Sequence, residues 1–177
     1  MTEAIKGRGL DLDAINILEK NDFVTVFGST FENSPWVAES AWVARPFASF
    51  DALHGALIGV VRNSPREVQI AFLCKHPELA GKEAVAGTMT TESVGEQASA
   101  GLHAMTRYEI RELHRLNSLY LDRHGFPFII AVRRYSKIEI FNQLRYRIER
   151  DSETELNEAM VQIGSITRLR VQDKVAT

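Results

Sequence analysis

Helix start signals recur through the second half of the chain, and they predict that this half is mostly helical. Three capping boxes, each a Ser or Thr followed three residues later by a Glu, begin at Thr106, Ser136 and Ser152. In such a box the hydroxyl and the carboxylate satisfy backbone N–H groups that a helix start leaves without partners. Apolar residues follow each box at spacings of three and four, which is the period of one helical face. We therefore predict three amphipathic helices after these positions.

The first half of the chain carries further helix starts, and one later segment resembles a strand. The expected helices run from Asp11 or Asp13 through Lys20, over 36–43 after Ser34-Pro35, onward from Ser49, and from Asn63-Ser64-Pro65 to near Pro77. The apolar run 128–132 fits either a short strand or a buried extended connector. The predicted fold class is all-α. We expect a single compact domain over 1–177 with about eight helices, one short extended segment near 128–132 and a frayed tail over 170–177.

Composition narrows the classes of protein to which the chain can belong. The 177 residues carry a net charge of −2, which argues against a dedicated nucleic-acid binder with a basic face. The single cysteine, Cys74, cannot form an intrachain disulfide or a thiolate zinc site. No apolar run approaches the ~20 residues of a membrane span, and the first ten residues do not resemble a signal peptide. The expectation is a cytoplasmic protein with no nucleic-acid or membrane partner.

The first candidate for chemistry is the run His76-Pro77-Glu78-Leu79-Ala80-Gly81. A helix that ends in His before Pro holds the imidazole at a rigid junction. Histidine titrates near neutral pH, so a fixed, half-exposed imidazole suits proton transfer. The alternative is a C-terminal His that interacts with the helix dipole, and spacing alone favours this structural interpretation.

The second candidate is the run Ser93-Val94-Gly95-Glu96-Gln97. Positions i, i+3 and i+4 share one helical face, so Ser93, Glu96 and Gln97 present a hydroxyl, a carboxylate and an amide together. The alternative is again structural, because Ser93 and Glu96 also have the spacing of a capping box at a helix start.

The third candidate is the run from His124 through Arg133. Gly125 and Pro127 bracket Phe126 in a non-helical turn that leads into the apolar run 128–132. An extended backbone leaves its N–H groups available to bind carbonyl or carboxylate oxygens of a ligand. The alternative is a hydrophobic plug in the core.

Together, the order and spacing of these motifs resemble the family of 2-oxo-4-hydroxy-4-carboxy-5-ureidoimidazoline (OHCU) decarboxylases. The upstream run Ser34-Pro35-Trp36-Val37-Ala38-Glu39 resembles the same family, and the similarity extends from about Phe27 to about Ile148. Two places depart from the family pattern. His124 stands where an apolar residue is more common, and Arg134-Tyr135 stands where Gly is expected.

The resemblance implies an all-helical, cofactor-free and metal-free carboxy-lyase, commonly a homodimer, that converts the small molecule OHCU to S-allantoin in urate breakdown. It implies that His76 is the general acid/base and that Glu96 is its partner near the substrate. It also implies a set of residues that bind the substrate or shape its pocket: Pro77, Ser93, Gln97, Phe126, Phe128, Ile129, Ile130 and Arg133.

Two rival classes stay open on the sequence. The first is a metal-binding helical protein that uses His76, His103, His114 and His124 with Glu92 or Glu96. Its spacing is unfavourable, since neither Glu-x-x-His nor His-Glu-x-x-His occurs. The second is a helical interaction module without chemistry, with a basic patch of Arg145, Arg147 and Arg150 beside Tyr146. We interpret these arginines as the solvated face of a helix whose apolar side is Ile140, Leu144 and Ile148.

Overall fold

The protein is described by a computed structural model that covers residues 9–81, 90–99 and 102–176. Helices make up the regular structure of these residues, and their one β feature is an isolated bridge between Leu10 and Val175. The all-α prediction is therefore confirmed. Two compact units can be distinguished, Met1–Gln69 with Gly164–Thr177 (unit 1) and Ile70–Ile163 (unit 2). In the part of the chain so described, no helix has both the length and the apolar character that crossing a membrane requires.

Unit 1 contains the N-terminal helices and the end of the last one. Its elements are α1 (Leu12–Asn16), α2 (Lys20–Phe27), α3 (Trp36–Ala41), α4 (Phe50–Arg62), the start of α5 (Arg66–Leu73), the end of α10 (Ser152–Gln172), and 3-10 turns at Gly28–Thr30 and Trp42–Ala44. The predicted cap at Ser49 is confirmed, because its hydroxyl accepts a 3.1 Å hydrogen bond from the N–H of Ala52.

The predicted single helix through Lys20 is wrong, since α1 ends at Asn16 and α2 starts at Lys20. Contacts distant in sequence interrupt it. The Asn16 amide forms two hydrogen bonds with the backbone of Phe47, and the Leu18 carbonyl accepts from Trp42 Nε1 at 3.1 Å. These tertiary hydrogen bonds replace the ones that a continuous helix would make.

The segment 170–176 makes contacts within unit 1, and its expected fraying stays a prediction. The N–H of Leu10 donates to the Lys174 carbonyl and the Leu10 carbonyl accepts from Ala176, both at 2.9 Å. Arg170 is buried and pairs with Glu32 at 3.2 Å. These partners are more than a hundred residues away in the sequence, so a local pattern cannot reveal them.

Unit 2 contains the end of α5, then α7 (Thr91–Ser99), α8 (Arg107–His124), α9 (Lys137–Ile148), the start of α10, and 3-10 turns at Leu102–Ala104 and Val132–Arg134. The capping boxes at Thr106 and Ser136 are confirmed, with both reciprocal hydrogen bonds present. The predicted box at Ser152 is wrong. The carboxylate of Asp151, one residue earlier, accepts from the N–H of Thr154 at 2.8 Å, and Glu155 is buried instead.

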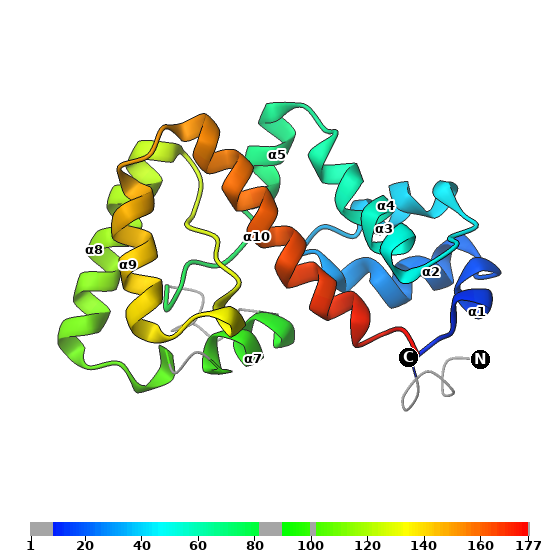
Figure 1. Cartoon of the computed structure of the whole chain (residues 1–177), viewed down its shortest axis with the longest axis horizontal. Coiled ribbons are helices and arrows are strands. Elements are labelled where there is room, and N and C mark those ends of the chain that lie inside the picture. The colour runs from blue at the N-terminus through cyan, green and yellow to red at the C-terminus, as the bar shows by residue number, and fades with distance from the viewer. Residues whose placement is uncertain (1–8, 82–89, 100–101, 177) are drawn as a thin grey trace. The chain divides into compact units, whose positions relative to one another are not determined.

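The segment from Phe126 to Ala131 is neither helix nor strand. In Figure 1 it is the yellow trace that runs from the C-terminal end of α8 to the 3-10 turn at Val132–Arg134, and this turn packs against α7. Every residue from Phe126 to Val132 is buried. The interpretation as a buried extended connector is confirmed, and the connector brings the third motif to the helix that carries the second.

Candidate functional site

His76 lies at a corner that follows directly after α5. Its Nδ1 is 3.3 Å from the Phe72 carbonyl oxygen, and its ring meets the Phe72 ring edge-on at a centroid distance of 4.9 Å. A carbonyl oxygen only accepts, so Nδ1 carries the proton in this hydrogen bond and a neutral imidazole presents Nε2 as its basic nitrogen. The half-buried ring is thus held in one tautomer and one orientation, which a general acid/base requires.

The loop after His76 is fastened to the two neighbouring helices of unit 2. Gln97 on α7 accepts from the N–H of Ala80 at 2.9 Å and donates to the Glu78 carbonyl at 3.4 Å. Asn117 on α8 donates to the Leu79 carbonyl at 3.1 Å. Gln97 therefore fixes the loop that carries Pro77, a role that its pattern did not predict. Its contact with a substrate stays a prediction.

The polar face of α7 is turned inward. Ser93, Glu96 and Gln97 are 6%, 8% and 8% exposed, so these three polar side chains are buried. Val94 and Gly95, which lie between them in the sequence, are exposed. The helix start does not explain them. Thr90 supplies the cap, since its hydroxyl accepts from the N–H of Ser93 at 3.3 Å and its carbonyl from Val94 at 3.0 Å. Polar groups that converge on one buried helix face are typical of a binding site, so this face is a candidate binding surface.

The extended segment 128–130 carries buried backbone N–H groups that have no hydrogen-bond acceptor among the described residues. In the described residues, no acceptor faces the N–H of Phe128, Ile129 or Ile130, although all three residues are at most 4% exposed. Buried N–H groups without acceptors are rare in folded proteins. The side chains do form part of the core, as the hydrophobic-plug alternative holds. The backbone nevertheless provides donors that a bound ligand could use.

These segments meet within unit 2. Cys74 Sγ lies 3.6 Å from the Gly125 carbonyl oxygen, which links the His76 corner to the turn before Phe126. Gln97 links the same corner to α7, and α7 contacts the 3-10 turn beyond residue 131. The three motifs are therefore brought together, while the direct pairing of His76 with Glu96 stays a prediction.

The remaining predicted residues fall into different environments. Pro77 is half-buried, whereas Phe126 is completely buried, with Tyr120 and His124 as ring neighbours at centroid distances of 6.0 Å. Arg133 is exposed on the 3-10 turn. The side chain of Phe126 is therefore part of the core, and its contribution to a substrate pocket stays a prediction. An exposed Arg133 retains the freedom to contact an anion.

His124, which departs from the family pattern, is a buried structural residue. Its ring nitrogens lie 2.9 Å from Ser152 Oγ and 3.2 Å from the Arg147 carbonyl oxygen, so it joins α8 to α9 and α10. Burial lowers the pKa of His124 because it disfavours the charged imidazolium. The same cause lowers the pKa of His54 in unit 1.

We predict that the protein loses stability as the pH falls through about 6.5, the usual pKa of histidine in an unfolded chain. The folded protein binds a proton at His124 less tightly than the unfolded chain does. The free energy of unfolding therefore decreases below that pH and levels off below the folded-state pKa. Denaturant unfolding between pH 5 and 8 measures this slope. His124→Gln should show a smaller decrease, with His54 responsible for part of the remainder. An identical slope for the variant and the unmodified protein would contradict the assignment.

A buried ionic cluster, missed in the sequence, supports the connector. Arg147 on α9 is 1% exposed and Glu155 on α10 is 0% exposed, and the two form an ion pair. Tyr120 donates to the same carboxylate at 2.5 Å, and burial together with this hydrogen bond raises the pKa of the phenol. The interpretation of Arg147 as part of a solvated face is therefore wrong. Its position seven residues after Ile140 and three after Leu144 places it on the apolar stripe, which was the available signal.

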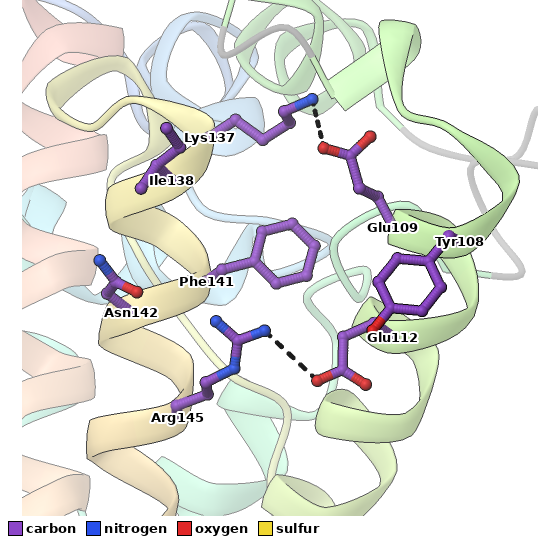
Figure 2. Close-up of a pocket in the computed structure, with 8 residues that line it drawn as sticks. All are labelled: Tyr108, Glu109, Glu112, Lys137, Ile138, Phe141, Asn142 and Arg145. Carbon is purple, nitrogen blue, oxygen red and sulfur yellow. Dashed lines mark hydrogen bonds and ion pairs between the residues drawn. The ribbon is translucent and has the colours of Figure 1, made fainter.

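The surface pocket of unit 2 is lined by residues outside these motifs, and the described residues do not form the metal-ligand cluster that the rival class requires. No group of three or more His, Cys, Asp or Glu residues able to hold a metal ion occurs among the described residues, and the His103 side chain lies outside them. Unit 2 also has a pocket of about 200 Å³ between α8 and α9. Figure 2 shows its lining residues, with the ion pairs Lys137–Glu109 and Arg145–Glu112 joining the two helices. None of the predicted site residues lines this pocket.

A helical unit that buries a carboxylate, fixes an imidazole and leaves backbone donors without acceptors has the features of an enzyme that acts on a small polar molecule. Comparison with known proteins specifies this class. The family model of OHCU decarboxylase matches residues 16–172, and the chain belongs to this family of carboxy-lyases of urate degradation.

Curated relatives agree with this assignment. The chain is 36% identical over 168 residues to the OHCU decarboxylase of Haloferax volcanii. This match covers 95% of this chain and 98% of that protein. It is 34% identical over 164 residues to the OHCU decarboxylase of Mus musculus, a match that covers 93% of this chain and 92% of that protein. It is also 39% identical over 162 residues to the uric acid degradation bifunctional protein PucL of Bacillus subtilis. That match covers 92% of this chain but only 32% of the longer protein.

Solved structures share the fold. A crystal structure of (S)-allantoin synthase superimposes with a TM-score of 0.72 at 23% identity, over 94% of this chain and 54% of that one. A crystal structure of OHCU decarboxylase in the presence of (S)-allantoin gives a TM-score of 0.64 at 20% identity, over 88% of this chain and 97% of that one. At these identities the similarity establishes the fold alone.

Proposed function

We propose that this chain decarboxylates OHCU to S-allantoin in urate breakdown, without a metal or an organic cofactor. One observation carries the proposal beyond family membership. The buried N–H groups of 128–130 lie in the same unit as the fixed imidazole of His76 and the inward-facing Glu96. These are a set of oxygen-binding donors, a proton carrier and a carboxylate.

The substrate's own structure explains how the reaction can proceed with side chains alone. When the bond between the ring carbon and the carboxylate breaks, carbon dioxide leaves and the electron pair moves into the adjacent ring C=N system. The hydroxyl on the former carboxylate-bearing carbon then becomes a carbonyl. A proton is added to the ureido-bearing carbon, which becomes the stereocentre of allantoin. The protein must accelerate the loss of carbon dioxide and deliver the proton to one face only.

His76 is assigned as the general acid/base that moves this proton, because its ring is oriented by the Phe72 carbonyl. Glu96 is assigned as its partner, either orienting the imidazole or disfavouring the substrate carboxylate by like charge. The ring and ureido groups would be bound by Ser93, Gln97 and the backbone of Phe128, Ile129 and Ile130. Pro77 and Phe126 would shape the pocket, and Arg133 would contact an anionic group.

We also propose that the protein forms a homodimer in the cytoplasm. The dimer follows from the family resemblance, and the compartment is consistent with a single cysteine, Cys74. Light scattering of the purified protein should give twice the mass of one chain. A mass equal to one chain at micromolar concentration would contradict the dimer.

The proposed activity is tested by generating OHCU in place from urate with a urate-oxidising enzyme and the ring-opening hydrolase that follows it. On addition of this protein, the absorbance of OHCU should decay faster than in the enzyme-free mixture, in proportion to the protein concentration. Decay at the spontaneous rate over a hundredfold range of protein would contradict the proposal. Metal analysis of the same sample separates the metal-binding rival, which requires stoichiometric metal.

A further inference from the structure

The connector 126–131 is held by two side chains that no predicted role explains. Arg147 donates from Nη1 to the Ile129 carbonyl oxygen at 2.9 Å, and its guanidinium lies 4.6 Å from the centre of the Phe128 ring. Gln162 on α10 accepts from the N–H of Ala131 at 3.0 Å. Both side chains are buried, so these contacts are shielded from water.

The two contacts fix the orientation of the peptide groups on either side of Ile130. A peptide unit is planar and trans, so its C=O and N–H point in opposite directions. Arg147 holds the Ile129 carbonyl, which directs the N–H of Ile130 away from Arg147. Gln162 holds the N–H of Ala131, which directs the carbonyl of Ile130 away from Gln162. In extended backbone the N–H and C=O of one residue point to the same side, so Ile130 presents a donor and an acceptor together.

The Ile130 pair has no partner within the described part of the chain. No described group accepts from its N–H or donates to its carbonyl, and the residue is 4% exposed. A donor beside an acceptor is the complement of an N–H beside a C=O, as in an amide or a urea. The ring lactam and the ureido arm of OHCU both carry this arrangement.

Each supporting side chain is itself fixed by a glutamate on α10, Arg147 by the buried Glu155 and Gln162 by the half-buried Glu158. Arg147 is paired with Glu155, to which it also donates from Nε at 2.6 Å, and Glu155 accepts from Tyr120. Gln162 donates from Nε2 to Glu158 at 2.8 Å, so its Oε1 is the atom that faces the connector. Neither side chain can rotate away without losing a second hydrogen bond.

We infer that Arg147 and Gln162 are positioning residues that hold the Ile130 backbone as a donor–acceptor pair for the amide or urea group of the substrate. The inference depends on the proposed function for the identity of that substrate. Neither residue need touch the substrate, since each acts through the peptide group that it holds.

The test uses matched variants of the full chain, with OHCU generated in place. Gln162→Leu removes the acceptor for the Ala131 N–H. The exchange Gln162→Glu with Glu158→Gln keeps an oxygen there and keeps one donor and one acceptor between the two side chains. Arg147→Lys keeps the charge beside Glu155 but loses the fixed fork of donors that reaches both Glu155 and Ile129. Tyr120→Phe removes the hydrogen bond from Tyr120 to Glu155 and leaves the Arg147–Ile129 hydrogen bond in place.

Gln162→Leu and Arg147→Lys should raise KM for OHCU roughly tenfold, the order of one misdirected hydrogen bond. The exchange Gln162→Glu with Glu158→Gln should restore a KM close to that of the unmodified protein. Tyr120→Phe should lower the unfolding temperature without changing KM. A folded Gln162→Leu with unchanged KM would overturn the inference, as would a Tyr120→Phe variant whose KM rises as much as that of Arg147→Lys. If Arg147→Lys does not fold, the comparison of KM between Gln162→Leu and the Gln162–Glu158 exchange tests the inference by itself. Absence of any decarboxylation by the unmodified protein would instead overturn the proposed function.

Discussion

His76→Asn should lower the turnover number for OHCU by a factor of about 10²–10⁴, the usual contribution of a general acid/base. Asn retains a polar group that can reach the Phe72 carbonyl, so the corner after α5 should keep its shape. It cannot exchange a proton near neutral pH, and that is the property which the proposed mechanism requires.

His114→Asn is the matched control for this prediction. His114 is also a half-buried histidine of unit 2, but it lies on α8 and belongs to none of the three motifs. The control should turn over at the rate of the unmodified protein. A folded His76→Asn variant that produces S-allantoin at an undiminished rate would remove His76 from the mechanism.

Glu96→Ala is expected to reduce turnover on the order of a hundredfold, because the variant removes a buried carboxylate from the inward face of α7. Glu96→Gln keeps nearly the same shape and removes the charge. If Glu96 acts through its charge, the Gln variant should be as slow as the Ala variant. If Glu96 acts only by accepting a hydrogen bond, Gln should recover most of the rate.

Glu92→Gln provides the control on the same helix, since Glu92 is half-buried in the first turn of α7 and outside the proposed face. Its turnover should be unchanged. Unmodified turnover in both Glu96 variants would make Glu96 a structural residue.

The parts of the fold that could be predicted are those decided by neighbours in the sequence. The capping boxes at Thr106 and Ser136 form because hydroxyl, carboxylate and helix start lie within four residues. The Ser152 box failed because Glu155 has a stronger use elsewhere, in the ion pair with Arg147. A local pattern cannot show that a distant cation competes for the carboxylate.

The same distinction applies to the candidate site. The motifs indicated the residue types and the chemistry, since an imidazole before Pro77 and a polar face on one helix can be identified from spacing. The supports could not be predicted. Gln97 holds the backbone of 78–80, and Arg147 and Gln162 hold that of 129–131, through contacts that join residues seventeen to thirty-one positions apart. Buried Arg147 was the most misleading case, because an Arg between other cations is normally solvated.

The most direct measurement of the central claim is circular dichroism of the allantoin formed when this protein is added to OHCU made in place from urate. Spontaneous decay of OHCU yields a racemate, which has no signal. We expect a signal of S-allantoin to accumulate rapidly, at a rate proportional to the amount of protein, and His76→Asn to abolish most of it. If no signal of S-allantoin forms while OHCU disappears at its spontaneous rate, this protein is not an OHCU decarboxylase.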